Sequence, residues 1–144
     1  MDAVARAEGS FREFEHTGDT GVEIDAHSRA DLFALALVAV AHLMVEPGSV
    51  RPLQERVLSV EAATDADLMH DLLSAAVNLF LTEGFIWGEA KIDEREGGLD
   101  ARLTGEPFDP GRHFLIQELK AITYHGLLVE SREGRWHARV IIDV

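Results

Sequence analysis

Apolar and charged residues alternate in two short runs near the start of the chain, on either side of a glycine-rich segment. Residues 11–15 alternate, and Val22, Ile24 and Ala26 resume the alternation after His16-Thr17-Gly18-Asp19-Thr20-Gly21. A period of two places successive side chains on opposite faces of a strand. The pattern therefore predicts two half-buried strands joined by a turn.

Two later segments repeat apolar residues at the spacing of an α-helix. The first follows Ser28-Arg29-Ala30-Asp31, which has the form of a capping box with Asp in place of the usual Glu or Gln, and runs to about Val45. The second is capped by Thr64 or Asp65 and stops at Gly84. We therefore expect two long helices.

Strand patterns recur in the rest of the chain, over residues 53–61, 85–95, 99–105, 119–131 and 136–144. Glu96-Gly97-Gly98 has the composition of a hairpin turn between two of these runs. Two long helices with about seven strands, mostly linked by hairpins, predict an α+β fold in which the helices pack against mostly antiparallel or mixed β-sheets.

The composition and charge restrict the classes of function. A chain of 144 residues suits one domain over residues 1–144, with a flexible segment over residues 1–10. The absence of cysteine excludes disulfides, thiolate zinc sites and cysteine nucleophiles. A net charge of −13 opposes tight nucleic-acid binding, because phosphate contacts require clustered Lys and Arg. The charge instead favours a hard cation or a protein partner with a basic surface.

No segment predicts export or contact with a membrane. Residues 1–10 lack the basic start and apolar core of a secretory signal. The most apolar stretch, residues 32–45, is interrupted by His42 and is too short to cross a bilayer. We therefore expect a cytoplasmic protein, for which the pattern specifies no oligomeric state.

Acidic residues at two predicted strand ends are candidates for a metal site. Asp19 lies where a strand breaks off, and Asp143 follows three aliphatic residues and precedes Val144, the last residue printed. An acid beside apolar neighbours is costly unless it is paired, hydrogen-bonded or bound to a cation. We expect Asp19 and Asp143 to meet, with the carboxylate of Val144 beside them. Oxygen donors favour Ca²⁺, with Mg²⁺ as the alternative. The simpler interpretation is an Asx turn at Asp19 and a hydrated strand end at Asp143.

A second candidate is catalytic. If residues 119–131 form one strand, Lys120 and Tyr124 share a face and His125 is adjacent, which could form an acid–base set. The simpler interpretation is an amphipathic strand with a hydrogen-bonded tyrosine, because no nucleophile lies beside a base. The other histidines show no metal-ligand spacing, and the common nucleotide and hydrolase motifs are absent.

Three motifs together resemble those of the archease family. They are HTGDTG near the start, GEPFDPGRH followed by ELKAITYHGLLVE, and WHARVIIDV at the end. Their order and spacing match over nearly the whole chain. The first motif differs at Gly18, where the family usually has Ala.

The resemblance implies an archease-like layered sandwich and a small non-enzymatic protein. Archeases assist the RtcB-type RNA ligase in tRNA splicing or RNA repair, by promoting its guanylylation and turnover. The family's metal ligands correspond to Asp19, Asp143 and Val144. A chaperone-like module that binds other proteins is the alternative expectation, and a small enzyme using Lys120, Tyr124 and His125 is a further one.

Overall fold

The computed structural model describes residues 7–16 and 19–144, which form two helices and eight strands. In chain order the elements are β1 (Gly9–His16), β2 (Asp19–Ala26), α1 (Arg29–Met44), β3 (Gln54–Glu61), α2 (Asp65–Glu83), β4 (Phe85–Arg95), β5 (Gly98–Pro107), β6 (Ala121–Ile122), β7 (Leu128–Arg132) and β8 (Arg135–Asp143). The predicted α+β class is confirmed. Residues 1–6, most of the expected flexible segment, lie outside the described residues, and β1 begins at Gly9.

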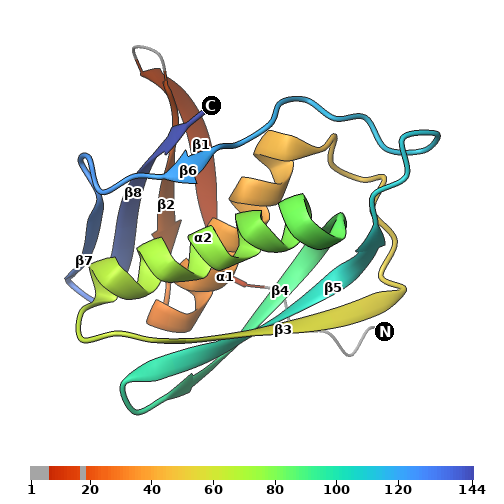
Figure 1. The fold of residues 1–144 in the computed structure, drawn as a ribbon. Helices are drawn as coiled ribbons and strands as arrows, with labels where there is room; N and C mark the ends of the chain where they lie inside the picture. Colours follow the sequence, from red (N-terminus) through yellow and green to blue (C-terminus); the bar gives the residue numbers. More distant parts are fainter. Residues whose placement is uncertain (1–6, 17–18) are drawn as a thin grey trace.

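The strands form two antiparallel sheets on two sides of the helices (Figure 1). The first sheet has the order β1-β2-β8-β6, with β7 also paired to β8. The second has the order β3-β5-β4 and contains the expected hairpin between β4 and β5. Every strand pairing among the described residues is antiparallel. The sequence left open antiparallel or mixed sheets, and the structure has the antiparallel type.

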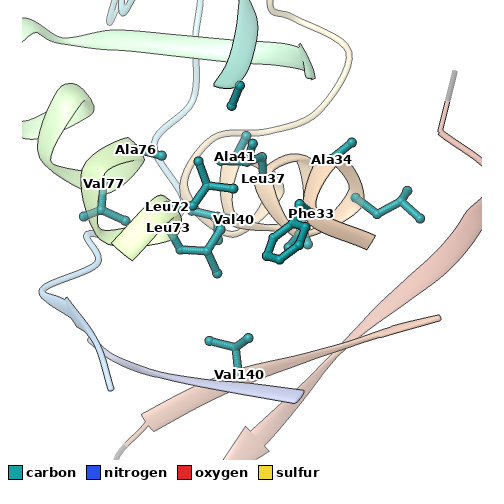
Figure 2. Close-up of a cluster of buried hydrophobic side chains, with 14 of the residues drawn as sticks. Phe33, Ala34, Leu37, Val40, Ala41, Leu72, Leu73, Ala76, Val77 and Val140 are labelled. Carbon is teal, nitrogen blue, oxygen red and sulfur yellow. The ribbon is translucent and has the colours of Figure 1, made fainter. Parts of the chain in front are cut away.

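Helix α1 is the centre of the core. Eleven of its 16 residues are buried, because it packs against α2 and against strands of both sheets. Figure 2 shows Phe33, Leu37 and Val40 of this helix close to Leu72 of α2 and Val140 of β8. A helix enclosed in this way needs apolar residues around most of its circumference, which the run of Ala, Leu and Val supplies.

The helix ends agree with the sequence. The side chain of Ser28 accepts a hydrogen bond from the backbone N–H of Asp31, and Thr64 caps α2 in the same way. Gly84 ends α2 in the left-handed conformation, with φ of 68°. Caps of this type satisfy N–H groups that the helix itself leaves without partners.

The single strand expected over residues 119–131 is wrong. The structure has only β6 and β7 there, separated by a turn in which Gly126 has φ of 65° and the N–H of Leu127 bonds to the carbonyl of Tyr124. Thr123 holds one side of this turn, because its hydroxyl donates to the carbonyl oxygen of Ile141 at 2.9 Å. Alternation alone did not reveal the left-handed glycine that divides the strand.

None of the helices among the described residues is long and apolar enough to span a membrane.

Candidate functional site

Asp19 and Asp143 lie directly opposite each other where β2 and β8 pair. Directly opposed residues of an antiparallel pair project from the same face of the sheet, with Cβ atoms about 4.5–5.5 Å apart. Asp19 also pairs with His16 of β1, and Asp143 pairs with Ala121 of β6. The two acids therefore occupy neighbouring positions at one end of the first sheet, and their expected proximity is confirmed.

Val144 follows Asp143, and the end of the chain lies beside the β1–β2 hairpin (Figure 1). Its side chain is half-buried and packs against the core. The backbone carbonyl of Asp143 accepts a hydrogen bond from the N–H of Lys120 at 2.8 Å, which ties β8 to the segment before β6.

An open cleft of about 640 Å³ lies at this end of the sheet. The described residues that line it include three acidic side chains and none that is basic; they are Glu13, Phe14, Glu15, Asp19, Thr20, Gln117 and Val144. Carboxylates gathered in one cleft create a negative potential that attracts cations. Asp19 and Val144, two of the three proposed ligand residues, therefore line the same cleft.

The donors at this site fit a hard cation by their chemistry. Asp19 and Asp143 supply carboxylate oxygens, the donor type that Ca²⁺ and Mg²⁺ prefer over nitrogen or sulfur. Within residues 7–16 and 19–144 no group of three or more His, Asp and Glu side chains is arranged to hold a metal ion. A complete shell would therefore need main-chain oxygens, a carboxylate at Val144 or water. Two motif residues, Thr17 and Gly18, lie outside the described residues.

The catalytic alternative loses its geometric basis, because Lys120 and Tyr124 do not share one strand. The hydroxyl of Tyr124 donates to Asp67 of α2 at 2.9 Å, and its ring stacks on His70 with centroids 4.0 Å apart. The hydrogen bond to Asp67, together with desolvation, raises the pKa of Tyr124 above its usual value. These contacts attach the turn to α2. His125 has interactions of its own and is not placed with Lys120 by any strand register.

A buried polar cluster that the sequence analysis did not identify lies at the end of β5 and in the loop that follows it. Glu106 has a side chain only 5% exposed, and it accepts hydrogen bonds from the N–H of Arg51 at 2.6 Å, from the guanidinium of Arg112 and from His113 at 3.1 Å. The N–H of Asp109 donates to Nδ1 of His113, so Nε2 carries the proton that His113 donates to Glu106. We call Glu106, Arg112 and His113 the Glu106 cluster.

The Glu106 cluster holds a carboxylate charge inside the protein. Burial opposes the charge, but the hydrogen bonds from Arg51, His113 and Arg112 outweigh it and lower the pKa of Glu106 below its usual value. These bonds close the loop that follows Pro107. The motif GEPFDPGRH contains all three residues of the cluster, yet nothing in its spacing shows that Glu106 is buried.

Comparisons with known proteins agree over almost the whole chain. The model of the archease protein family matches residues 11–144. The archease of Methanopyrus kandleri is 32% identical over 138 residues, which cover 93% of this chain and 99% of that protein. The archease of Pyrococcus abyssi is 30% identical over 139 residues, covering 93% of this chain and 98% of that one.

Solved structures show the same architecture. A solution structure of a Methanobacterium thermoautotrophicum protein superposes with a TM-score of 0.78 at 27% identity, covering 93% of this chain and 98% of that one. The crystal structure of a Thermotoga maritima archease, described as a possible chaperone, matches in fold with a TM-score of 0.62 at 20% identity, over 91% of this chain and 94% of that one. The Methanopyrus kandleri, Pyrococcus abyssi and Thermotoga maritima relatives are named as archeases. With a family model that matches residues 11–144, this chain belongs to the archease family.

Proposed function

We propose that this chain is a metal-binding, non-catalytic activator of an RtcB-type RNA ligase, promoting guanylylation and turnover of the ligase in cytoplasmic tRNA splicing or RNA repair. The observation that carries the proposal is the cross-strand pair of Asp19 and Asp143 in a chain of the archease family. Two carboxylates side by side at the end of a sheet repel each other, and a cation bound between them would relieve that repulsion.

Asp19, Asp143 and Val144 are the proposed ligands, and Ca²⁺ is the proposed ion, with Mg²⁺ as the alternative. A bound divalent ion would supply positive charge at the tip of an acidic protein, where phosphate oxygens are its natural counterparts. The chain contributes two carboxylates on paired strands. The backbone at Asp143 is fixed in position, because β8 is paired on both sides there.

The charge of the whole chain supports a basic protein partner. A ligase that binds RNA and GTP presents a basic surface to them, and a protein of net charge −13 is steered toward such a surface. The acidic cleft beside Asp19 concentrates part of this charge where we place the metal. Salt should weaken the association by slowing the encounter.

The test is guanylylation of a purified RtcB-type ligase with limiting GTP, with and without this protein. We expect the wild-type protein to increase both guanylylation and the number of turnovers, and Asp143→Asn to increase them less. Asp93→Asn is the matched control, because it removes an exposed acid from the second sheet. No stimulation by the wild-type protein with Ca²⁺ or Mg²⁺ present would refute the proposal.

A chaperone-like role is the second candidate. It is favoured by the description of the Thermotoga maritima archease as a possible chaperone and by exposed apolar side chains at residues 114–116. Suppression of aggregation of several unrelated proteins would support it. Stimulation of the ligase without such suppression would oppose it.

A further inference from the structure

Three consecutive large apolar residues are exposed after the Glu106 cluster. Phe114 is 67% exposed, Leu115 37% and Ile116 44%. Single exposed apolar residues are common on protein surfaces, but a contiguous group marks an interaction site more often than chance. We call residues 114–116 the apolar segment.

The apolar segment is fixed to the end of α1. The N–H of Ile116 donates to the carbonyl of Met44 at 2.7 Å, and the N–H of Glu46 donates to the carbonyl of Phe114 at 3.0 Å. Leu115 forms an isolated antiparallel bridge with Val45. The backbone of the segment is therefore paired like a short strand. Side chains presented on an ordered backbone lose less conformational freedom on binding than those of a mobile loop.

The Glu106 cluster fixes the segment from the other side. His113 precedes Phe114, its side chain is fully buried, and it donates to Glu106 at 3.1 Å. Arg112 reaches both Glu106 and the carbonyl of Ser49. The chain is thus immobilised by a buried polar cluster immediately before it exposes three apolar side chains. Among the described residues, Phe114 belongs neither to the buried core nor to the partly buried residues packed against it.

Two acidic residues flank the apolar segment, and Lys120 is exposed two residues after the second of them. Glu46 and Glu118 are exposed on its two flanks. Gln117, which comes next in the chain, donates to the carbonyl of Leu43 at 3.2 Å and lines the cleft shared by Glu13, Glu15 and Asp19. The apolar segment is therefore continuous with the acidic cleft of the candidate metal site. Figure 1 shows the loop before β6, the C-terminus and the end of the β1–β2 hairpin at the same end of the molecule.

We propose that the apolar segment is the docking contact for a protein partner whose surface has an apolar pocket within a basic rim. The inference rests on the proposed function, in which the partner is the RtcB-type ligase. It adds the surface of this chain that contacts the ligase. An apolar centre with a charged rim is the usual composition of a protein interface. A second copy of this chain is disfavoured as the occupant, because it would bring two acidic rims together.

The test compares Phe114→Ser and Ile116→Ser with Val57→Ser. Val57 is 56% exposed on β3 of the second sheet, so its substitution removes a similar exposed apolar side chain elsewhere. Binding to the immobilised ligase is measured together with calcium titration of each variant. We expect Phe114→Ser to weaken ligase binding at least tenfold and Ile116→Ser to weaken it measurably, with Val57→Ser like wild type. Calcium binding should be the same in all four proteins.

The outcomes separate this inference from the proposed function. If the wild-type protein neither binds nor stimulates the ligase, the proposed function fails, and this inference with it. If the wild type stimulates the ligase and Phe114→Ser binds as tightly as wild type, the docking surface lies elsewhere and the inference alone is overturned. Sedimentation velocity gives a further arm: a wild-type dimer that Phe114→Ser converts to monomer would assign the segment to self-association and overturn the inference.

Discussion

Asp143 pairs with Asp19 on one side and with Ala121 on the other, so the two acids are neighbours within a continuous sheet although they come from opposite ends of the chain. Like charges directly opposite each other in an antiparallel pair destabilise it. A bound cation reverses the sign of that contribution, because each carboxylate then faces an opposite charge. The pair should therefore make stability depend on divalent ions.

Substituting Asp143 by Asn should have opposite effects with and without calcium. In chelator, Asp143→Asn should stabilise the fold by about 0.2–1 kcal/mol, because repulsion by the opposed Asp19 is removed. With calcium in excess the wild type should gain stability and the variant much less. Thermal unfolding in EDTA and in calcium measures both effects, with Asp93→Asn as the control. Equal stabilisation of wild type and Asp143→Asn by calcium would exclude Asp143 as a ligand.

Val144 is tested by extension rather than by substitution. In a protein expressed to end at Val144, adding a short tag converts the α-carboxylate into a neutral amide and removes one negative charge from the site. Calcium affinity follows the number of charged oxygens, so the tagged form should bind more weakly, as Asp143→Asn should. The fold should tolerate the tag, because extensions at exposed strand ends are usually accepted. Isothermal titration calorimetry with calcium measures the affinity of the tagged and untagged proteins. If only Asp143→Asn loses affinity, Val144 does not act through that carboxylate.

The protein alone should bind RNA weakly. Its net charge is −13, and many of its arginines are already paired with acids, as Arg29 is with Asp65 and Arg95 with Glu61. Binding that does not neutralise phosphates releases few counterions and shows little dependence on salt. Filter binding of single-stranded RNA at low and moderate salt measures this. A tight complex that salt dissociates steeply would contradict the prediction.

Local sequence signals predicted the helices and the hairpins well. Ser28, Thr64 and Gly84 end the helices as expected, because capping depends on a few neighbouring residues. The same kind of local signal failed at Gly126, where the choice between a strand and a turn depends on packing of Tyr124 against His70 of α2. The alternation of apolar and polar residues does not show which distant segments of the chain come into contact.

The candidate site was only partly accessible from sequence. The acids at two strand ends indicated that Asp19 and Asp143 meet, and the register confirms it. Glu106 was not found, because a single Glu beside Pro107 resembles any loop carboxylate until the fold buries it against Arg51 and His113. Burial of a charge depends on tertiary structure.

Gly105 should be more sensitive to substitution than any ordinary strand glycine. A Cβ at this position would overlap the carbonyl oxygen of Ile86 and lie 2.6 Å from the Cα of Trp87, both on the paired strand β4. Backbone atoms of a paired strand cannot move aside without breaking the ladder, so Gly105→Ala should destabilise by about 3 kcal/mol or more. Gly88→Ala is the control, because its nearest contact would be 3.6 Å from a side chain. Urea unfolding of both variants checks this, and equal midpoints would contradict it.

Glu106→Gln should destabilise the fold in a way that depends on pH. Glutamine replaces one acceptor oxygen by an amide that donates, which leaves a hydrogen-bond donor of Arg51, Arg112 or His113 without its acceptor in a buried site. At about pH 7 the expected loss is about 2–4 kcal/mol, the range for breaking a buried charged hydrogen-bond cluster.

The sign of the pH dependence follows from the direction of the shift. The pKa of Glu106 is lower in the folded protein than its ordinary value of 4.5, so the unfolded state binds this proton more readily. Its stabilising contribution is therefore complete above that value and is lost as the pH falls through the lower pKa of the folded state. Glu106→Gln has no such group to protonate. The difference in unfolding free energy between wild type and variant should be largest near neutral pH and should shrink below about pH 4.

Urea unfolding of wild type, Glu106→Gln and Glu61→Gln at several pH values between about 3.5 and 7 makes this measurable. Glu61 is the matched control, because its ion pair with Arg95 has a carboxylate side chain 72% exposed and should contribute little at any pH. If the difference for Glu106→Gln stays constant across this range, folding does not lower the pKa of Glu106, and if the difference instead grows as the pH falls, the carboxyl is neutral in the folded protein; either result would contradict the prediction. If the difference shrinks as the pH falls, the buried charge of Glu106 fixes the loop that carries the apolar segment.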